Sequence, residues 1–69
     1  MRIEWADGYA VRVRRLGDET VISANREGLL SLAKQFAALA EAAPGEHIHY
    51  DEYNSLEEGS AALIVERTE

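Results

Sequence analysis

The sequence predicts one α+β domain, residues 1–69, with one amphipathic helix packed on one face of a mainly antiparallel sheet of four or five strands. Two observations predict strands: residues 9–15 and 46–51 alternate between apolar and polar side chains, as half-buried strands do. A third predicts the helix, because apolar residues recur with a helical period after residue 25. The predicted order of elements is therefore β-β-β-α-β-β, which a single small domain can accommodate.

The first part of the chain is expected to form a three-strand meander. Residues 1–5 carry apolar side chains on one side of a short strand, and residues 9–15 form the second strand. Gly17-Asp18 then predicts a tight turn. Residues 20–22 are all β-branched, which suits a third strand.

The helix is expected to begin after Asn25, which is a good N-cap, and to end before Pro44-Gly45. Gly28 lowers the helix propensity of the first turn, so it either permits a close approach to the sheet or is merely tolerated there. The apolar residues of the helix fall within about half of its circumference. The residues expected to face the sheet are Leu29, Leu32, Ala33, Phe36, Leu39 and Ala40.

Beyond the helix, residues 46–51 and 61–66 predict the last two strands. The sheet residues expected to meet the helix are Val11, Val13, Ile48, Tyr50, Leu63 and Val65. One helix covers only one face of a sheet, so the other face must meet water or a second copy of the chain. Ala62 and Ile64 are apolar on that other face, which favours a homodimer.

Composition excludes several classes of function. The chain has no cysteine, so neither a disulfide framework nor a thiolate metal site can form. Its net charge of −6 argues against nucleic-acid binding, and no apolar run is long enough to cross a membrane. Without a signal peptide, a nucleophile motif or a phosphate-binding loop, we expect a cytoplasmic protein that is not an enzyme. The basic residues Arg12 and Arg14 share a strand face and are expected to pair with Glu19 rather than to bind phosphate.

The negative charge is concentrated in the last third of the chain. Residues 46–69 carry a net charge of −6, whereas residues 1–18 and 19–45 carry +1 and −1. Acids interleaved with tyrosines suit a basic protein partner, because charge steers the encounter and aromatic rings supply contact area. The alternative is a solvated loop that keeps the protein soluble. The candidate partner-binding residues are Tyr50, Asp51, Glu52, Tyr53, Asn54, Glu57 and Glu58.

A second pattern is the alternation of His47, His49 and Asp51. On a strand these side chains project from one face, with about 7 Å between successive ones. They could hold zinc or another divalent metal, with a second copy completing the site, or the histidines could form a pH-responsive pair in an interface. Solvated surface histidines are the simpler interpretation, in which the protein has no cofactor. A structural or regulatory homodimer without a ligand is a further alternative.

Three stretches of the chain resemble a known family. They are ISANREGLLSLA at residues 22–33, GEHIHYD at residues 45–51 and LIVER at residues 63–67. A helix that opens as Asn-x-Glu-Gly-Leu, followed by Gly-x-His-x-His-x-Asp and a hydrophobic last strand, is similar to the immunity protein 32 family, an α+β group encoded beside bacterial polymorphic-toxin genes. The resemblance spans about residues 20–67. It implies a protein that binds and neutralises a cognate toxin, with a nuclease as the expected target, and that does no chemistry itself.

Overall fold

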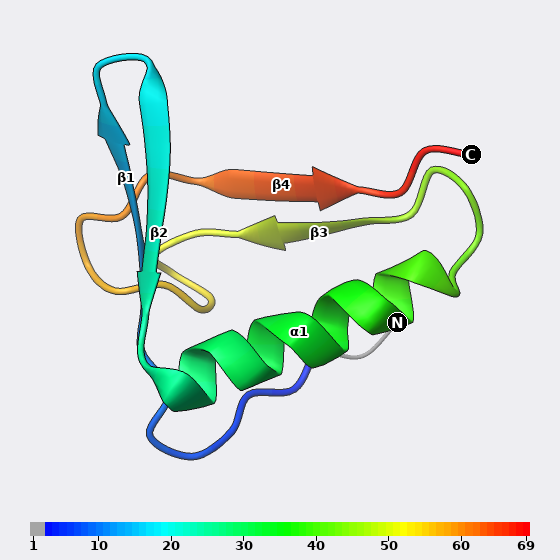
Figure 1. Cartoon of the computed structure of the whole chain (residues 1–69), viewed down its shortest axis with the longest axis horizontal. Coiled ribbons are helices and arrows are strands. Elements are labelled where there is room, and N and C mark those ends of the chain that lie inside the picture. The colour runs from blue at the N-terminus through cyan, green and yellow to red at the C-terminus, as the bar shows by residue number, and fades with distance from the viewer. Residues whose placement is uncertain (1–2) are drawn as a thin grey trace.

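A computed structural model of the chain describes residues 3–69 as two antiparallel hairpins and one helix (Figure 1). Strand β1 (Val11–Leu16) pairs with β2 (Glu19–Ala24), helix α1 (Arg26–Ala40) follows, and β3 (His47–Tyr50) pairs with β4 (Leu63–Glu66). The α+β class with one helix is therefore confirmed. The predicted sheet of four or five strands is wrong, because the strands form two separate two-stranded sheets.

The two hairpins are joined through the outer edge of β1 instead of through a continuous ladder. The carbonyl of Val11 accepts a hydrogen bond from the amide of Glu57, and that of Val13 accepts one from the amide of Ala61, each at 2.9 Å. Between these two bonds, residues 57–60 form a turn, so the backbone of this segment bonds to the backbone of β1 only at its ends, and the Ser60 hydroxyl accepts a further bond from the amide of Val13 at 3.2 Å. It nevertheless occupies the edge at which β1 would have to pair with the second hairpin, and the two sheets stay separate.

The predicted first strand, residues 1–5, contains no strand from residue 3 onward, and its first two residues lie outside the described part of the chain. Side chains of α1 bind the backbone of this segment. The Ser31 hydroxyl accepts a hydrogen bond from the amide of Ala6 at 2.9 Å, and the Gln35 amide group donates one to the carbonyl of Glu4 at 2.8 Å. Because the helix satisfies these groups, the segment runs along α1 and pairs with no strand.

The tight turn between β1 and β2 is confirmed at Gly17-Asp18. The register places Leu16 opposite Glu19, so the loop has two residues. Gly17 has a positive φ of 62° and no non-glycine residue of the described chain does, which is the pattern of a type II′ turn. Such a turn matches the natural twist of two antiparallel strands, so this local sequence fixes the register of the whole hairpin.

The N-cap at Asn25 is confirmed, and the same side chain ties α1 to the first hairpin. Its Oδ1 accepts hydrogen bonds from the amides of Gly28 at 2.8 Å and Ala10 at 3.0 Å, and its Nδ2 donates to the carbonyl of Gly8 at 2.8 Å. A Cβ atom on Gly28 would lie only 2.7 Å from the carbonyl oxygen of Ala10 and 2.9 Å from a methyl group of Val11. Gly28 is therefore required for the close approach between helix and hairpin.

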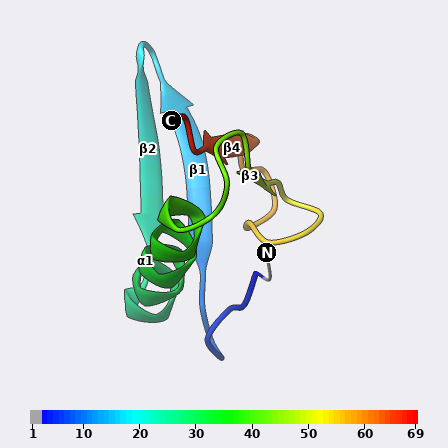
Figure 2. The same ribbon diagram turned by 90° about the vertical axis from the view of Figure 1, so that its right-hand side faces the viewer.

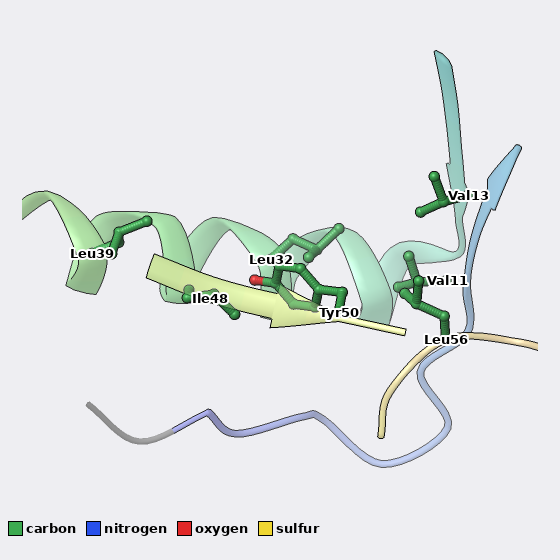
Figure 3. Packing of buried hydrophobic residues seen from close by; sticks show 7 residues of the cluster. All are labelled: Val11, Val13, Leu32, Leu39, Ile48, Tyr50 and Leu56. Atoms are coloured by element: carbon green, nitrogen blue, oxygen red, sulfur yellow. The ribbon is translucent and has the colours of Figure 1, made fainter. Parts of the chain in front are cut away.

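The core is shared by α1 and both hairpins (Figure 3). Leu63 and Val65 pack against it and are half-buried. The polar residues Ser31 and Gln35 are buried on the helix side of the core, which the sequence did not predict. The buried apolar residues are Val11, Val13, Leu32, Leu39, Ile48, Tyr50 and Leu56.

The predicted helix face is only partly correct. Leu32 and Leu39 are buried as expected. The residues that were expected in the core but are exposed are Leu29, Ala33, Phe36 and Ala40. The helix also ends at Ala40, with Glu41 as its C-cap, one turn before Pro44. The cause of the rotated face is that Ser31 and Gln35 turn inward to bind the N-terminal segment.

The molecule is flat, with principal extents of 31 × 31 × 19 Å. Viewed from the side, α1 and β2 lie on one side of the molecule, and the loop that follows β3 projects on the opposite side (Figure 2). Within residues 3–69, no helix has the length and apolar character needed to cross a membrane.

The close approach at Gly28 predicts that replacing this helical glycine with alanine destabilises the protein, whereas the same change within a helix usually stabilises it. Gly28→Ala should lower the free energy of unfolding by about 1–3 kcal/mol, because the new methyl group overlaps the carbonyl of Ala10, even though alanine is the better helix former. Urea unfolding followed by circular dichroism measures the change. The exposed helix position Ala38 provides the control, since Ala38→Gly should lose only the propensity difference of about 1 kcal/mol. A Gly28→Ala variant more stable than the parent would contradict the described packing.

Candidate functional site

The candidate partner-binding surface is the loop that connects β3 to β4. We call its residues 51–58 the acidic turn. In Figure 2 this loop projects from the side of the molecule opposite to α1. The Tyr53 side chain is 90% exposed, and the Glu57 and Glu58 side chains are exposed as well. The acidic turn thus presents an aromatic ring and free carboxylates together.

Asp51 shapes the first half of the acidic turn. Its Oδ1 accepts hydrogen bonds from the backbone amides of Tyr53 at 2.9 Å and Asn54 at 3.0 Å, and its carbonyl accepts one from the amide of Leu56 at 2.9 Å. The Asn54 side chain closes the arrangement, because its Nδ2 donates to the carbonyl of His49 at 3.0 Å and its Oδ1 accepts from the amide of Asp51 at 3.1 Å. These bonds form an Asx turn, so the Asp51 carboxylate organises the backbone.

The second half of the acidic turn is fastened to the rest of the fold. Leu56 is buried in the core, and the amide of Glu57 donates to the carbonyl of Val11 at 2.9 Å. The carboxylate of Glu52 reaches across the loop and accepts a hydrogen bond from the amide of Gly59 at 2.7 Å. A loop that is already ordered loses less conformational entropy when a partner binds. The acidic turn is therefore a preorganised surface.

The groups left free on this surface are acidic and aromatic. Within residues 3–69, no hydrogen bond or ion pair engages the side-chain carboxylates of Glu57 and Glu58. An open hollow of about 350 Å³ lies beside them, lined by Tyr9 and residues 52–58. Arg12 lies at its border, where its guanidinium donates to the backbone carbonyl of Glu58 at 3.5 Å. The surface can accept hydrogen bonds from, and attract, a basic side chain.

Tyr50 lies below this surface and is only 1% exposed, so its ring belongs to the core and contributes no contact area to the candidate surface. Its hydroxyl donates a hydrogen bond to Oε1 of Gln35 at 2.7 Å. Burial raises the pKa of this hydroxyl to about 12. Trp5 packs edge-on against the Tyr50 ring at 6.0 Å and stacks on Tyr9 at 4.2 Å, so its ring covers one side of the core.

The histidines lie exposed on the outer face of β3, as the alternation predicts. In the register of the second hairpin, His47 is opposite Glu66 and His49 is opposite Ile64. The third predicted ligand, Asp51, uses its carboxylate within the acidic turn. In the described part of the chain, no three histidine, aspartate or glutamate side chains gather as a group that could hold a metal ion. A zinc site on these histidines would need ligands from a second copy, and it stays a prediction.

The expected pairing of Arg12 and Arg14 with Glu19 is wrong for the described chain. Glu19 lies opposite Leu16 at the tip of the first hairpin, whereas the Arg14 guanidinium donates to the hydroxyl of Ser23 at 3.4 Å. Arg12 turns toward the acidic turn, as described above. The outer face of the first hairpin is thus basic and solvated.

Sequence reasoning missed the residues that hold the acidic turn in place. Leu56 reads as an isolated leucine in a polar stretch, yet it is the buried anchor of the loop. Asp51 and Asn54 are predicted partner-binding residues because of their charge and polarity. Two such residues three positions apart are also typical of an Asx turn, and this signal could have revealed their structural role. Gly59 has a positive φ of 86° and gives its amide to Glu52.

Comparison with known proteins adds one match. A family model described as Immunity protein 32 matches residues 19–68, a span that runs from β2 through α1 and the acidic turn to the end of β4. No curated protein and no solved structure matches the chain significantly. The family match confirms the resemblance seen in the sequence.

The Asx turn predicts that two substitutions of Asp51 differ. Asp51→Ala removes the acceptor for the amide of Tyr53, so hydrogen exchange at this amide should accelerate by about tenfold or more. The amide of Asn54 also loses the carboxylate but keeps the Asp51 carbonyl at 3.3 Å as an acceptor, so its exchange should accelerate less. Asp51→Asn keeps an oxygen at the same place and should leave this protection nearly unchanged. Exchange followed by NMR measures both variants. Equal exchange rates in the parent and Asp51→Ala would contradict the structural role of this carboxylate.

The buried hydroxyl predicts a pH dependence. Because the pKa of Tyr50 is raised in the folded state, its contribution to stability is complete below pH about 10 and is lost as the pH rises through about 12. Tyr50→Phe should lose this part of the alkaline destabilisation. At neutral pH it should cost about 1–3 kcal/mol, because Oε1 of Gln35 is left without its donor.

Urea unfolding between neutral pH and pH about 12 tests this dependence. Tyr53→Phe makes the same chemical change at an exposed ring and should follow the parent curve. Parallel curves for Tyr50→Phe and the parent would show that the Tyr50 hydroxyl does not titrate differently in the two states.

Proposed function

Because the chain belongs to the Immunity protein 32 family, we propose that it binds a cognate bacterial toxin in the cytoplasm and neutralises it without catalysing a reaction. The observation that carries this proposal is the family match, which covers residues 19–68 and thus all of the regular structure except β1. Inhibition by binding requires a stable, preformed surface and no reactive group. The ordered acidic turn meets this requirement.

The contact with the toxin is assigned to the acidic turn and its border. Tyr53 offers a ring that is 90% exposed, and an exposed tyrosine supplies a large contact area at a small entropic cost. The free carboxylates of Glu57 and Glu58 lie near this ring in sequence, and the loop backbone beneath them is fixed. Together they form a compact acidic surface with one aromatic anchor.

The chemistry of this surface favours a basic partner. A nuclease needs positive charge where it holds the phosphate backbone of its substrate, so its active site attracts carboxylates as well. An inhibitor that places several carboxylates at that site would exclude the nucleic acid by occupying the same groups. A nuclease is accordingly the toxin class that this surface suits best, and long-range attraction would speed the encounter.

Where a toxin gene lies beside the gene of this chain, binding to its purified product tests the proposal. Titration calorimetry should show a complex in which Tyr53→Ala weakens the affinity by about tenfold or more. The double variant Glu57→Gln with Glu58→Gln should weaken it by a similar factor at low salt, and the difference from the parent should shrink as salt is added. Where the toxin is a nuclease, one equivalent of the chain should abolish cleavage of a nucleic-acid substrate.

The matched control is Glu19→Gln with Glu69→Gln, which removes the same charge at exposed positions away from the acidic turn. This control should change the affinity by less than about threefold. Equal weakening by both double variants would show that only net charge matters and would reject the acidic turn as the contact. Failure of the parent chain to bind the toxin would reject the function itself.

A further inference from the structure

Helix α1 carries a second apolar face that the rest of residues 3–69 leaves exposed. We call Leu29, Ala33, Phe36 and Ala40 the helix stripe. At about 100° per residue these four side chains fall within about 60° of the helix circumference, and the stripe contains no polar residue. All four are exposed, with Leu29 at 55% and Phe36 at 38% of their full accessible area. A helix of a folded monomer usually turns such a stripe inward.

The molecule exposes more surface than the average folded monomer of its size. A folded chain of 7.7 kDa should expose about 4300 Å², whereas this chain exposes 4887 Å². The excess of about 550–600 Å² approaches the roughly 800 Å² that each partner buries in a standard interface. The flat shape of the molecule accounts for the excess, since its shortest extent is 19 Å. A second protein layer packed against the flat molecule would bury this excess of exposed surface.

The distribution of charge allows a second copy of the chain to bind at α1. A chain with a net charge of −6 repels its own kind, so two copies can associate only where the acids are remote. The acidic turn projects from the side of the molecule opposite to α1 (Figure 2). Two molecules joined through α1 would hold their acidic turns far apart, and both turns would remain open to other partners.

The order of side chains in the helix stripe is self-complementary. Large and small residues alternate along it, and the four positions are symmetric about a point between residues 34 and 35. In an antiparallel two-fold arrangement, Leu29 faces Ala40 of the partner subunit, and Ala33 faces Phe36 of the partner subunit. Every large side chain then meets a small one, which lets two helices approach closely, as ridges packed into grooves. A two-fold axis requires this property, because the same patch must fit itself.

From these observations we propose that the protein is a two-fold symmetric homodimer in which the helix stripes of two copies pack antiparallel. The interface is independent of the acidic turn and of any toxin. It also differs from the dimer that the sequence suggested through Ile64, which lies in β4, and Ala62, which directly precedes this strand. The occupant of the helix stripe is thus a second copy of this chain.

Sedimentation equilibrium of the full chain over a wide range of concentrations tests the dimer. The parent should sediment with twice the mass of one chain. Ala33→Glu places a charge in the centre of the helix stripe and should yield a monomer. Ala38→Glu makes the same change on the opposite side of the same helix, at another exposed alanine, and should remain dimeric. Circular dichroism should show that both variants are folded.

An exchange of side chains tests the pairing itself. Phe36→Ala alone leaves alanine against alanine, and Ala33→Phe alone forces phenylalanine against phenylalanine, so each should weaken the dimer by about tenfold or more. The double variant Ala33→Phe with Phe36→Ala restores one large and one small side chain at each contact. Its dissociation constant should return to within about threefold of the parent value.

Three results would overturn the proposal. One is a parent chain that stays monomeric at every concentration. Another is equal dissociation of Ala33→Glu and Ala38→Glu, which would show that charge alone prevents association. The third is a double variant no tighter than its single parents, which would reject the antiparallel pairing. If the helix stripe variants instead lost toxin binding while their mass stayed unchanged, the stripe would belong to the toxin interface.

Discussion

The buried side-chain amide of Gln35 is the contact that most determines how this chain is arranged. It donates to the backbone of Glu4 and accepts from the hydroxyl of Tyr50, so it joins the N-terminal segment, α1 and β3 at one point. Gln35 is only 3% exposed, and an unsatisfied amide at that depth would be costly. No side-chain nitrogen or oxygen buried in the described residues lacks a partner. Because Gln35 must face inward, the rotation of the helix about its axis is fixed.

That rotation explains why the helix has two apolar faces. Ser31 lies one turn before Gln35 on the same side of the helix, and it accepts a hydrogen bond from the amide of Ala6. Turning both polar residues inward carries Leu29 and Phe36 outward, although both are better suited to a core. The chain thus satisfies the backbone of its N-terminal segment and leaves apolar surface exposed as the consequence. The exposed helix stripe follows from the polar contacts of the core.

The sequence predicts the elements well and their assembly poorly, and the reason differs from element to element. The turn at Gly17-Asp18 and the cap at Asn25 depend on neighbouring residues, so local chemistry reveals them. The two separate sheets depend on the bond between Glu57 and Val11, whose positions are far apart in the chain and carry no pattern. The buried face of the helix was predicted from the positions of its apolar residues, which places Gln35 on the exposed side. The hydrogen bond from Gln35 to the carbonyl of Glu4 joins residues distant in the chain, and no sequence pattern indicates it.

The candidate site shows the same division. The acidic turn was predicted from its charged and aromatic residues, which can be read directly from the sequence. The separate roles of these residues depend on geometry. Asp51 organises the backbone of the acidic turn, and Tyr50 lies beneath it in the core. Of the two tyrosines at positions 50 and 53, only Tyr53 is exposed. Two neighbouring tyrosines of similar sequence context therefore have opposite roles.

A small core also links the two proposals physically. A domain of this length buries only about 60% of its unfolded surface, so its stability is marginal, and any partner that binds only the folded state adds to it by mass action. Association through the helix stripe would stabilise the helix that holds Gln35, and through Gln35 the ring of Tyr50 beneath the acidic turn. In the proposed dimer, the surface assigned to the toxin is thus held in place from the face through which the two copies associate.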